Sequence, residues 1–318
     1  MKSRKVSGKP VVVGVDGSPE SVRAAALGWR IAKAGGVGCA LVCALPDPGP
    51  ATAFGPPLYS PDLYERLYAE TRRAVMDALR PELPPALVES VEVRVGRPAD
   101  VLAHVAAKMG AGLVVVGGRH HGALARGLGG STAHTLVRTV GIPVLVAGPG
   151  APALERVLAA VDLSEAAAPT FAVAAQYARL LDARLRVLHV VEPIRFPIVV
   201  PLTVDASEFE RRSTIAFEDM LRGVEDTDTV DRIVRPGTAV EAIATEAVAW
   251  SAGLVVVGSH GRNWLDRLVI GSTTERLLNL LPVSLLVVPI EAGRPRARRR
   301  APTRRRRSHP RPRKGARP

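Results

Sequence analysis

Glycine, serine and threonine recur at one spacing in two stretches of this chain, each directly after a run of valines. Residues 113–132 read LVVVGGRHHGALARGLGGST, and residues 254–273 read LVVVGSHGRNWLDRLVIGST, at an offset of 141 with no gap. A strand that ends in glycine, followed by a glycine that opens a helix through Ser-Thr, can wrap backbone amides around phosphate. This is because a helix N-terminus presents unpaired N–H groups and a positive dipole end. The pattern therefore predicts nucleotide binding in each half of the chain.

Alternating strands and helices are expected to position these two stretches. Each half opens with an apolar run that ends at an aspartate, Asp16 or Asp162. Ser18 followed by Pro19 predicts a helix N-cap and first helical position, and Ser164 is expected to repeat this in the second half. The expected strands are residues 11–15, 40–45, 91–96, 113–116 and 143–148 in the first half, and 157–162, 185–191, 232–237, 254–257 and 284–289 in the second.

Continuous apolar strands that alternate with helices predict an α/β fold of two tandem doubly wound domains. Each domain is expected to be a five-stranded parallel sheet flanked by helices. Such sheets bind ligands at the carboxyl ends of their strands, at the point where the strand order reverses. Asp16 should therefore meet the loop after residue 116, and Asp162 the loop after residue 257.

The 318-residue length and the repeat predict domains at residues 1–150 and 151–291, followed by a tail at 292–318. The tail holds twelve Arg, one Lys and no acidic residue, so it carries all 13 net positive charges and the rest of the chain is neutral. Its proline content predicts disorder. Its charge suits contact with a polyanion through residues 294–317 by counterion release, and a solvated extension without a dedicated partner is the alternative.

Other candidate chemistry is weaker. Cys39 and Cys43 share one face of an expected strand, which fits buried thiols in a reducing cytoplasm. No apolar run approaches the roughly 20 residues that span a bilayer, so no membrane contact is expected. His120 and His121 lack further ligands at metal spacing, and no metal site is assigned. No nucleophile, base and orienting group recur together, so no catalytic residue is assigned.

The glycine spacing, the aspartate after strand one and the LHV of residues 188–190 together resemble the nucleotide-binding kind of universal stress protein. The resemblance covers residues 8 to about 290, as a tandem-domain member. It implies strand order 3-2-1-4-5 in each half and ATP, with or without Mg²⁺, held without a Walker lysine; no G-x-x-x-x-G-K-[ST] motif occurs here. It also implies a stress-responsive sensor or regulator whose halves pair through their fifth strands as a pseudo-dimer, and further homodimerisation is compatible with it.

The resemblance also implies a nucleotide-binding role for individual positions. In the second half, Asp162 matches the carboxylate that contacts adenosine, and Val190 matches the strand-two backbone position that reads adenine. The phosphate loop and helix start correspond to Gly258, His260, Gly261, Gly271, Ser272 and Thr273. The first half keeps Asp16, Gly117, Gly130, Ser131 and Thr132, and Ala44 stands at the strand-two position that corresponds to Val190.

The first half departs from the pattern at two places. His120 stands where the second half has Gly261, and residues 42–44 read VCA where the second half has LHV. A non-glycine residue is penalised if that position needs a positive φ, and the imidazole either crowds the phosphates or, when protonated, pairs with them. Nucleotide binding by the first half is left open on these grounds.

Three other interpretations stay open at this point. A plain turn or helix cap would equally explain Asp16 and Asp162, and glycines often serve only to form turns. The fold can act as an interaction scaffold without nucleotide, or activity can reside in nucleic-acid association through the tail. Family analogy allows slow ATP hydrolysis, although no catalytic base is identified.

Overall fold

The computed structural model describes residues 8–45, 61–118, 132–149, 154–192, 206–222, 230–260, 270–280 and 282–290. The elements of the first half are β1 (Val11–Gly14), α1 (Pro19–Gly35), β2 (Cys39–Leu45), α2 (Pro61–Leu79), α3 (Pro85–Glu89), β3 (Glu92–Val95), α4 (Pro98–Met109), β4 (Leu113–Gly117), α5 (Thr132–Thr139) and β5 (Val144–Ala147). Those of the second half are β6 (Arg156–Val161), α6 (Ala167–Leu181), β7 (Arg184–Val191), α7 (Ala206–Arg222), β8 (Asp231–Pro236), α8 (Ala239–Ala249), β9 (Leu254–Gly258), α9 (Ser272–Leu280) and β10 (Ser284–Val288).

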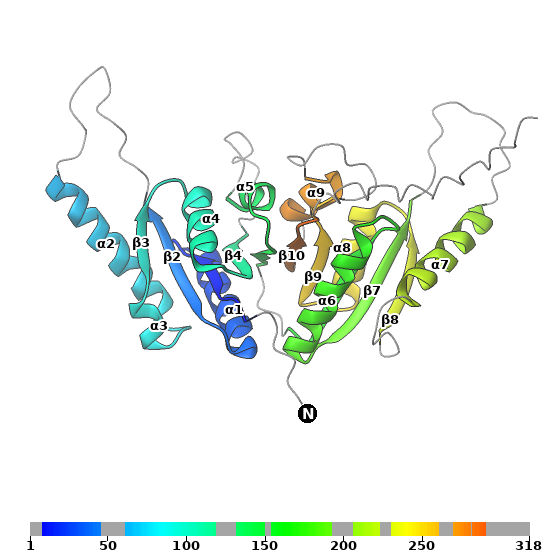
Figure 1. Ribbon diagram of the computed structural model, residues 1–318, viewed down its shortest axis with the longest axis horizontal. Helices are drawn as coiled ribbons and strands as arrows, with labels where there is room; N and C mark the ends of the chain where they lie inside the picture. The colour runs from blue at the N-terminus through cyan, green and yellow to red at the C-terminus, as the bar shows by residue number, and fades with distance from the viewer. Residues whose placement is uncertain are drawn as a thin grey trace, which may run out of the picture.

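The two halves share one ten-stranded sheet, with the order β3-β2-β1-β4-β5-β10-β9-β6-β7-β8 (Figure 1). Each half is parallel and has the predicted order 3-2-1-4-5, so the fold prediction is confirmed. The halves meet at β5 and β10, which pair antiparallel with Leu145 opposite Leu286. The fifth strands therefore join two expected five-stranded sheets into one mixed sheet.

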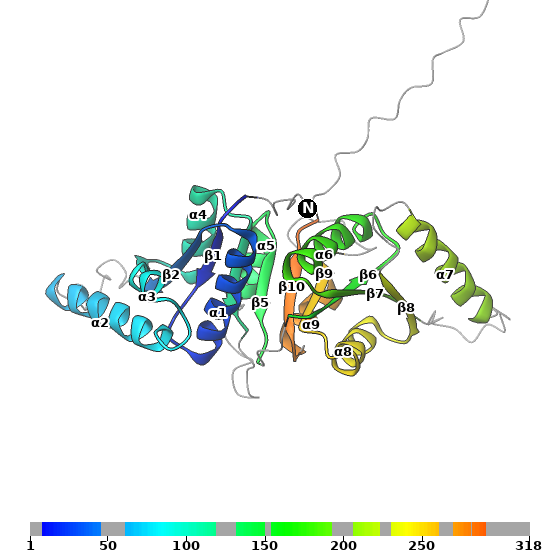
Figure 2. The ribbon, with the colours of Figure 1, turned by 90° about the horizontal axis from the view of Figure 1, so that it is seen from below.

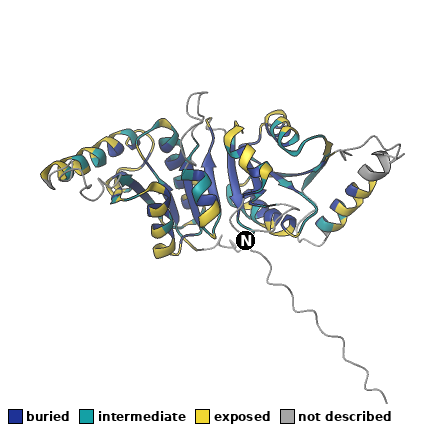
Figure 3. Ribbon diagram, turned by 90° about the horizontal axis from the view of Figure 1, so that it is seen from above, coloured by how far each residue is buried: buried dark blue, intermediate teal, exposed yellow. Residues whose placement is uncertain are grey.

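Alternation along the strands divides the core between the two faces of this sheet. Val11 and Val13 pack on the face covered by α1, α2, α6 and α7, whereas Val12 packs on the face covered by α4, α5, α8 and α9. Figure 3 shows the buried strands between helices whose outer faces are exposed. Valine suits these strands because a branched side chain packs well on a pleated surface that is covered on both sides.

Helix α1 begins as the sequence predicts, whereas α6 begins later. Ser18 is the N-cap of α1, its hydroxyl accepts the Ser21 N–H at 3.3 Å, and Pro19 is the first helical residue. In the second half, Ala166 occupies the N-cap and Ser164 accepts the Ala166 N–H at 3.1 Å instead. The expectation for Ser164 was therefore wrong, because its hydroxyl supports a turn that precedes the helix.

At the seam between the halves, β5 and β10 lie side by side (Figure 2). The Gly148 N–H donates to the Ser284 hydroxyl at 3.2 Å, and a Cβ at Gly148 would lie 2.5 Å from the carbonyl carbon of Val283. Beside the strands, α5 contacts α9, and Arg138 Nη2 lies 4.0 Å from Glu275 Oε1. Burial lowers the pKa of His134 on α5, and the nearby Glu275 carboxylate opposes that shift.

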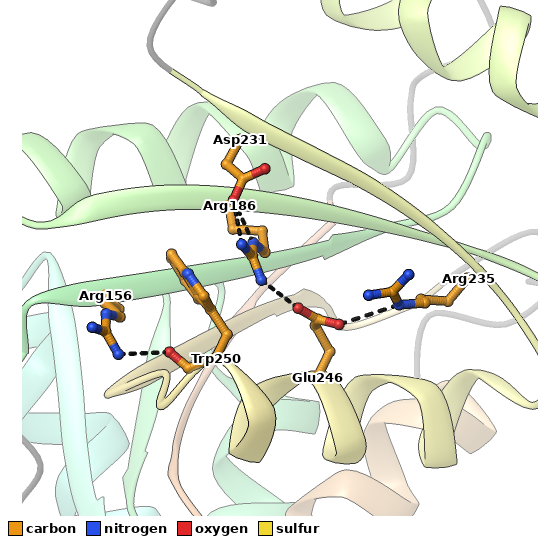
Figure 4. Close-up of polar contacts among 6 residues, drawn as sticks. All are labelled: Arg156, Arg186, Asp231, Arg235, Glu246 and Trp250. Carbon is orange, nitrogen blue, oxygen red and sulfur yellow. Dashed lines mark hydrogen bonds and ion pairs between the residues drawn. The ribbon is translucent and has the colours of Figure 1, made fainter.

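An ionic cluster surrounds the buried Glu246 carboxylate in the second half (Figure 4). Arg186 on β7 pairs with Asp231 on β8 and with Glu246 on α8, where Nη1 lies 2.5 Å from Oε1. The guanidinium also lies over the Trp250 ring, 4.5 Å from its centroid. Arg235 approaches the other Glu246 oxygen at 3.3 Å. The cluster thus fastens β7, β8 and α8 together, and it extends along β8 from Asp231 to Arg235, which pairs in register with Val190.

Both cysteines contact the same core on one face of β2, as predicted from their spacing. Burial raises the pKa of Cys39 to about 12 and that of Cys43 to about 11, with the Asp16 carboxylate adding to the shift at Cys43. Both are therefore thiols at neutral pH, as expected of packing residues. None of the helices within the described ranges is long and apolar enough to cross a bilayer. The basic tail lies outside those ranges.

Candidate functional site

The carboxyl ends of the central strands bring the predicted residues of each half to one edge of the sheet. In the first half, β1 lies between β2 and β4, so Asp16 after β1 is a neighbour of Gly117 at the end of β4. In the second half, β6 lies between β7 and β9 in the same way, which places Asp162 beside Gly258. Both pairs stand at the point where strand order reverses, where such sheets bind ligands.

The two aspartates form the same local turn. Oδ1 of Asp16 accepts the Ser18 N–H at 3.0 Å and the Ser18 hydroxyl. Oδ1 of Asp162 accepts the Ser164 N–H at 3.1 Å and the Ser164 hydroxyl. These are Asx turns, so the plain structural interpretation of both aspartates holds. The turn also keeps each carboxylate at the carboxyl edge of the sheet. Contact between these carboxylates and a nucleotide stays a prediction.

Val190 and Ala44 occupy the predicted strand-two positions. Val161 pairs with His189 in register, so Val190 is the next residue along β7 and is level with Asp162. Gly14 pairs with Val42, which puts Ala44 level with Asp16. His189 is a core residue: its Nδ1 lies 3.0 Å from the Val161 carbonyl oxygen and its ring stacks on Phe217 with centroids 5.7 Å apart. These contacts account for the burial of its ring.

Hydrogen bonds tie the loop after β9 to the start of α9. The Ser259 carbonyl accepts the Gly271 N–H at 2.9 Å, and the Thr274 hydroxyl donates to the Gly258 carbonyl at 2.8 Å. The Ser259 N–H donates to Val288 in β10 at 2.8 Å. Ser259 and Thr274 are both buried. The ends of the loop between residues 258 and 271 are therefore held together at the sheet edge.

The first turn of α9 lies at this closure. Its first i to i−4 bond runs from the Glu275 N–H to the Gly271 carbonyl at 2.9 Å. The amides of Ser272 and Thr273 come before that bond, at the end of the helix where the dipole favours an anion. Thr132 opens α5 in the corresponding place in the first half. This arrangement can hold a phosphate by backbone N–H groups and hydroxyls.

The glycines at the strand ends have packing reasons that the sequence did not reveal. A Cβ at Gly117 would lie 2.8 Å from the Glu20 carbonyl carbon, and one at Gly118 would lie 2.8 Å from the Ala147 carbonyl oxygen. At Gly258 the nearest atoms are looser, with Thr170 Oγ1 at 3.1 Å. Helix α1 therefore requires glycine at 117, whatever the ligand. The predicted residues Gly130, Ser131 and Gly261, and also His120, lie outside the described ranges.

Ser259 and Thr274 were missed by the sequence analysis. Their counterparts at the 141-residue offset are Gly118 and Ala133, so the comparison of the two halves gave them no weight. The sequence indicated them only by a hydroxyl side chain at both positions of the second copy. No group of three or more His, Cys, Asp or Glu side chains with the geometry of a metal site occurs in the part of the chain that the structure describes.

Comparison with known proteins identifies the family. The profile of the Universal stress protein family matches residues 8–148 and again residues 153–289. This chain belongs to the universal stress protein family. It is a tandem universal stress protein, with one match in each half of the ten-stranded sheet.

Relatives match either nearly the whole chain or one half of it. A universal stress protein of Mycobacterium tuberculosis is 28% identical over 305 residues, which cover 90% of this chain and 98% of that protein. One from Thermus aquaticus is 31% identical over 135 residues, or 42% of this chain and 96% of its own length. The crystal structure of a universal stress protein from Archaeoglobus fulgidus matches with a TM-score of 0.59 at 19% identity, over 89% of this chain and 99% of that one. That likeness shows the fold.

Proposed function

We propose that this tandem universal stress protein binds an adenine nucleotide, chiefly ATP, and acts as a stress-responsive sensor or regulator in the cytoplasm. The observation that carries the proposal is the closure in the second half, where Ser259 and Thr274 hold the start of α9 against the end of β9. The closure puts helix-start amides for phosphate on the same edge as Asp162 and Val190, the matched positions for adenosine. Residues 1–150 and 151–291 are the two domains in this proposal.

The first half supports the proposal less strongly. It keeps Asp16 in the same Asx turn and Thr132 at the helix start. Ala133, however, has no hydroxyl to make the bond that Thr274 donates to the Gly258 carbonyl, and Gly118 has none for the bonds that the Ser259 hydroxyl makes with Ile290 and His260. We therefore assign the second half as the principal nucleotide site.

The test is calorimetric titration of ATP with Mg²⁺ into the full chain after any co-purified nucleotide has been removed. One or two sites per chain are expected. Asp162→Ala should weaken ATP binding at the second site, whereas Asp100→Ala, an exposed aspartate in α4, should leave it unchanged. A titration without heat and without thermal stabilisation by ATP would refute nucleotide binding and favour a scaffold.

A further inference from the structure

His260 carries an unsatisfied nitrogen at the proposed nucleotide site. Its Nδ1 lies 2.9 Å from the Ser259 hydroxyl oxygen, while its Nε2 is shielded from water and has no hydrogen-bond partner among the described residues. A buried polar group without a partner costs roughly 1–3 kcal/mol and calls for an explanation. A ligand atom that completes the bond is one such explanation, because His260 directly follows the Gly258–Ser259 end of β9.

The hydrogen bonds around Ser259 decide which nitrogen of His260 carries the proton. The Ser259 hydroxyl oxygen already accepts the Ile290 N–H at 3.0 Å. Its own proton needs an acceptor, and among the described residues the hydrogen-bonded neighbour that can accept it is His260 Nδ1. A neutral imidazole that accepts at Nδ1 carries its proton at Nε2. The buried Nε2 is therefore a donor, and the atom it lacks is an acceptor.

We infer that the Ser259–His260 pair is a phosphate-reading element, in which Ser259 orients the imidazole and Nε2–H donates to an anionic oxygen of the bound nucleotide. This inference rests on the proposed function. A phosphate oxygen suits the donor better than a base or ribose atom, because His260 directly follows Ser259, whose carbonyl holds Gly271 at the start of α9.

The first half cannot build this pair. Gly118 occupies the position that corresponds to Ser259 and makes the same backbone bond, from its N–H to the Ala147 carbonyl at 3.0 Å. A Cβ there would lie 2.8 Å from that same carbonyl oxygen, so serine does not fit without a backbone shift. Residue 119 is arginine instead of histidine. The oriented pair of Ser259 and His260 therefore has no counterpart at residues 118 and 119.

Two substitutions of His260 separate the two ring nitrogens. Asparagine places an amide near Nδ1, where it keeps a partner for Ser259 and has no atom at Nε2. Glutamine reaches farther and places an N–H near Nε2. The full chain is then titrated with Mg²⁺-ATP and with adenosine, which lacks phosphate. A substitution that removes a phosphate contact lowers the affinity for ATP and leaves the affinity for adenosine almost unchanged.

We expect His260→Asn to weaken ATP binding at the second site about tenfold to a hundredfold, the usual range for a bond to a charged acceptor, and adenosine binding less than about twofold. His260→Gln should recover most of the ATP affinity. His104→Asn, at an exposed histidine of α4, is the matched control and should change neither.

Three outcomes would overturn the inference. They are unchanged ATP affinity in His260→Asn, equal losses for ATP and adenosine, and a loss in His260→Gln as large as in His260→Asn. Unfolding temperatures of the free variants show whether a loss comes from the fold. Absence of ATP binding by the wild-type chain would refute the proposed function itself, and this inference would fall with it.

Discussion

Replacement of Glu246 by alanine should destabilise the second half by about 3 kcal/mol. The Glu246 side chain is 6% exposed, and its two oxygens accept from Arg186 and Arg235. Removal of one partner from a buried ion pair costs about 3–5 kcal/mol, because the other charge stays buried without compensation. Arg186 keeps Asp231 and the face of Trp250, so the lower end of that range applies.

The assay is urea unfolding of wild-type and variant chains, followed by tryptophan fluorescence and circular dichroism. Glu155→Ala, at an exposed glutamate in the same half, should stay within about 0.5 kcal/mol of wild type. The double variant Arg186→Ala with Glu246→Ala should cost less than the sum of the single changes, since neither charge is then left alone. A cost below about 1 kcal/mol for Glu246→Ala, or strict additivity, would show that Glu246 does not compensate a buried arginine.

Two further predictions concern the seam and the thiols. Gly148→Ala should destabilise the chain by about 2 kcal/mol and speed hydrogen exchange of β10, because the new methyl group meets the backbone of Val283. The control is Gly141→Ala, where nothing lies within 4 Å of the new methyl group. Equal unfolding curves for the two variants would refute the packing argument. Cys39 and Cys43 should resist a thiol reagent at pH 8 until the chain unfolds. Because their folded pKa values of about 12 and about 11 lie above the ordinary 9.0, the unfolded chain loses these protons first, so the free energy of unfolding should fall as pH rises from about 9 to 11. In urea unfolding, Cys43→Ala should make this fall with pH less steep. An unchanged dependence on pH in that variant would contradict the raised pKa of Cys43.

The sequence predicted the order of elements and the sheet because its signals are periodic and occur twice. Valine runs such as that before Gly117, an aspartate at each strand-one end and the serine–proline start of α1 each have one common structural solution. The repeat supported every assignment with a second copy. The strand bounds differ from the prediction by about one residue, because the hydrogen bonding of the last residue determines where a strand ends.

The details of the site could not be predicted, because they depend on neighbours distant in sequence. Gly117 is required by the Glu20 backbone, and the role of Ser259 depends on Ile290, which lies 31 residues away. The ionic cluster of Arg186 and Glu246 was equally hidden, since the first half has Ala40 and Val105 at the corresponding positions. Comparison of the copies finds what the halves share, and these features are where they differ.

The contact between α5 and α9 limits which partners the two halves can accept. His134 and Glu275 occupy corresponding positions, 141 residues apart, and yet they are neighbours across the seam. In a dimer of identical chains, a residue near the twofold axis faces its own copy. Two first halves would set histidine against histidine beside unpaired Arg138, and two second halves would set glutamate against glutamate. Produced as separate chains, the halves are therefore expected to prefer unlike pairs, by the small amount that an exposed ion pair contributes.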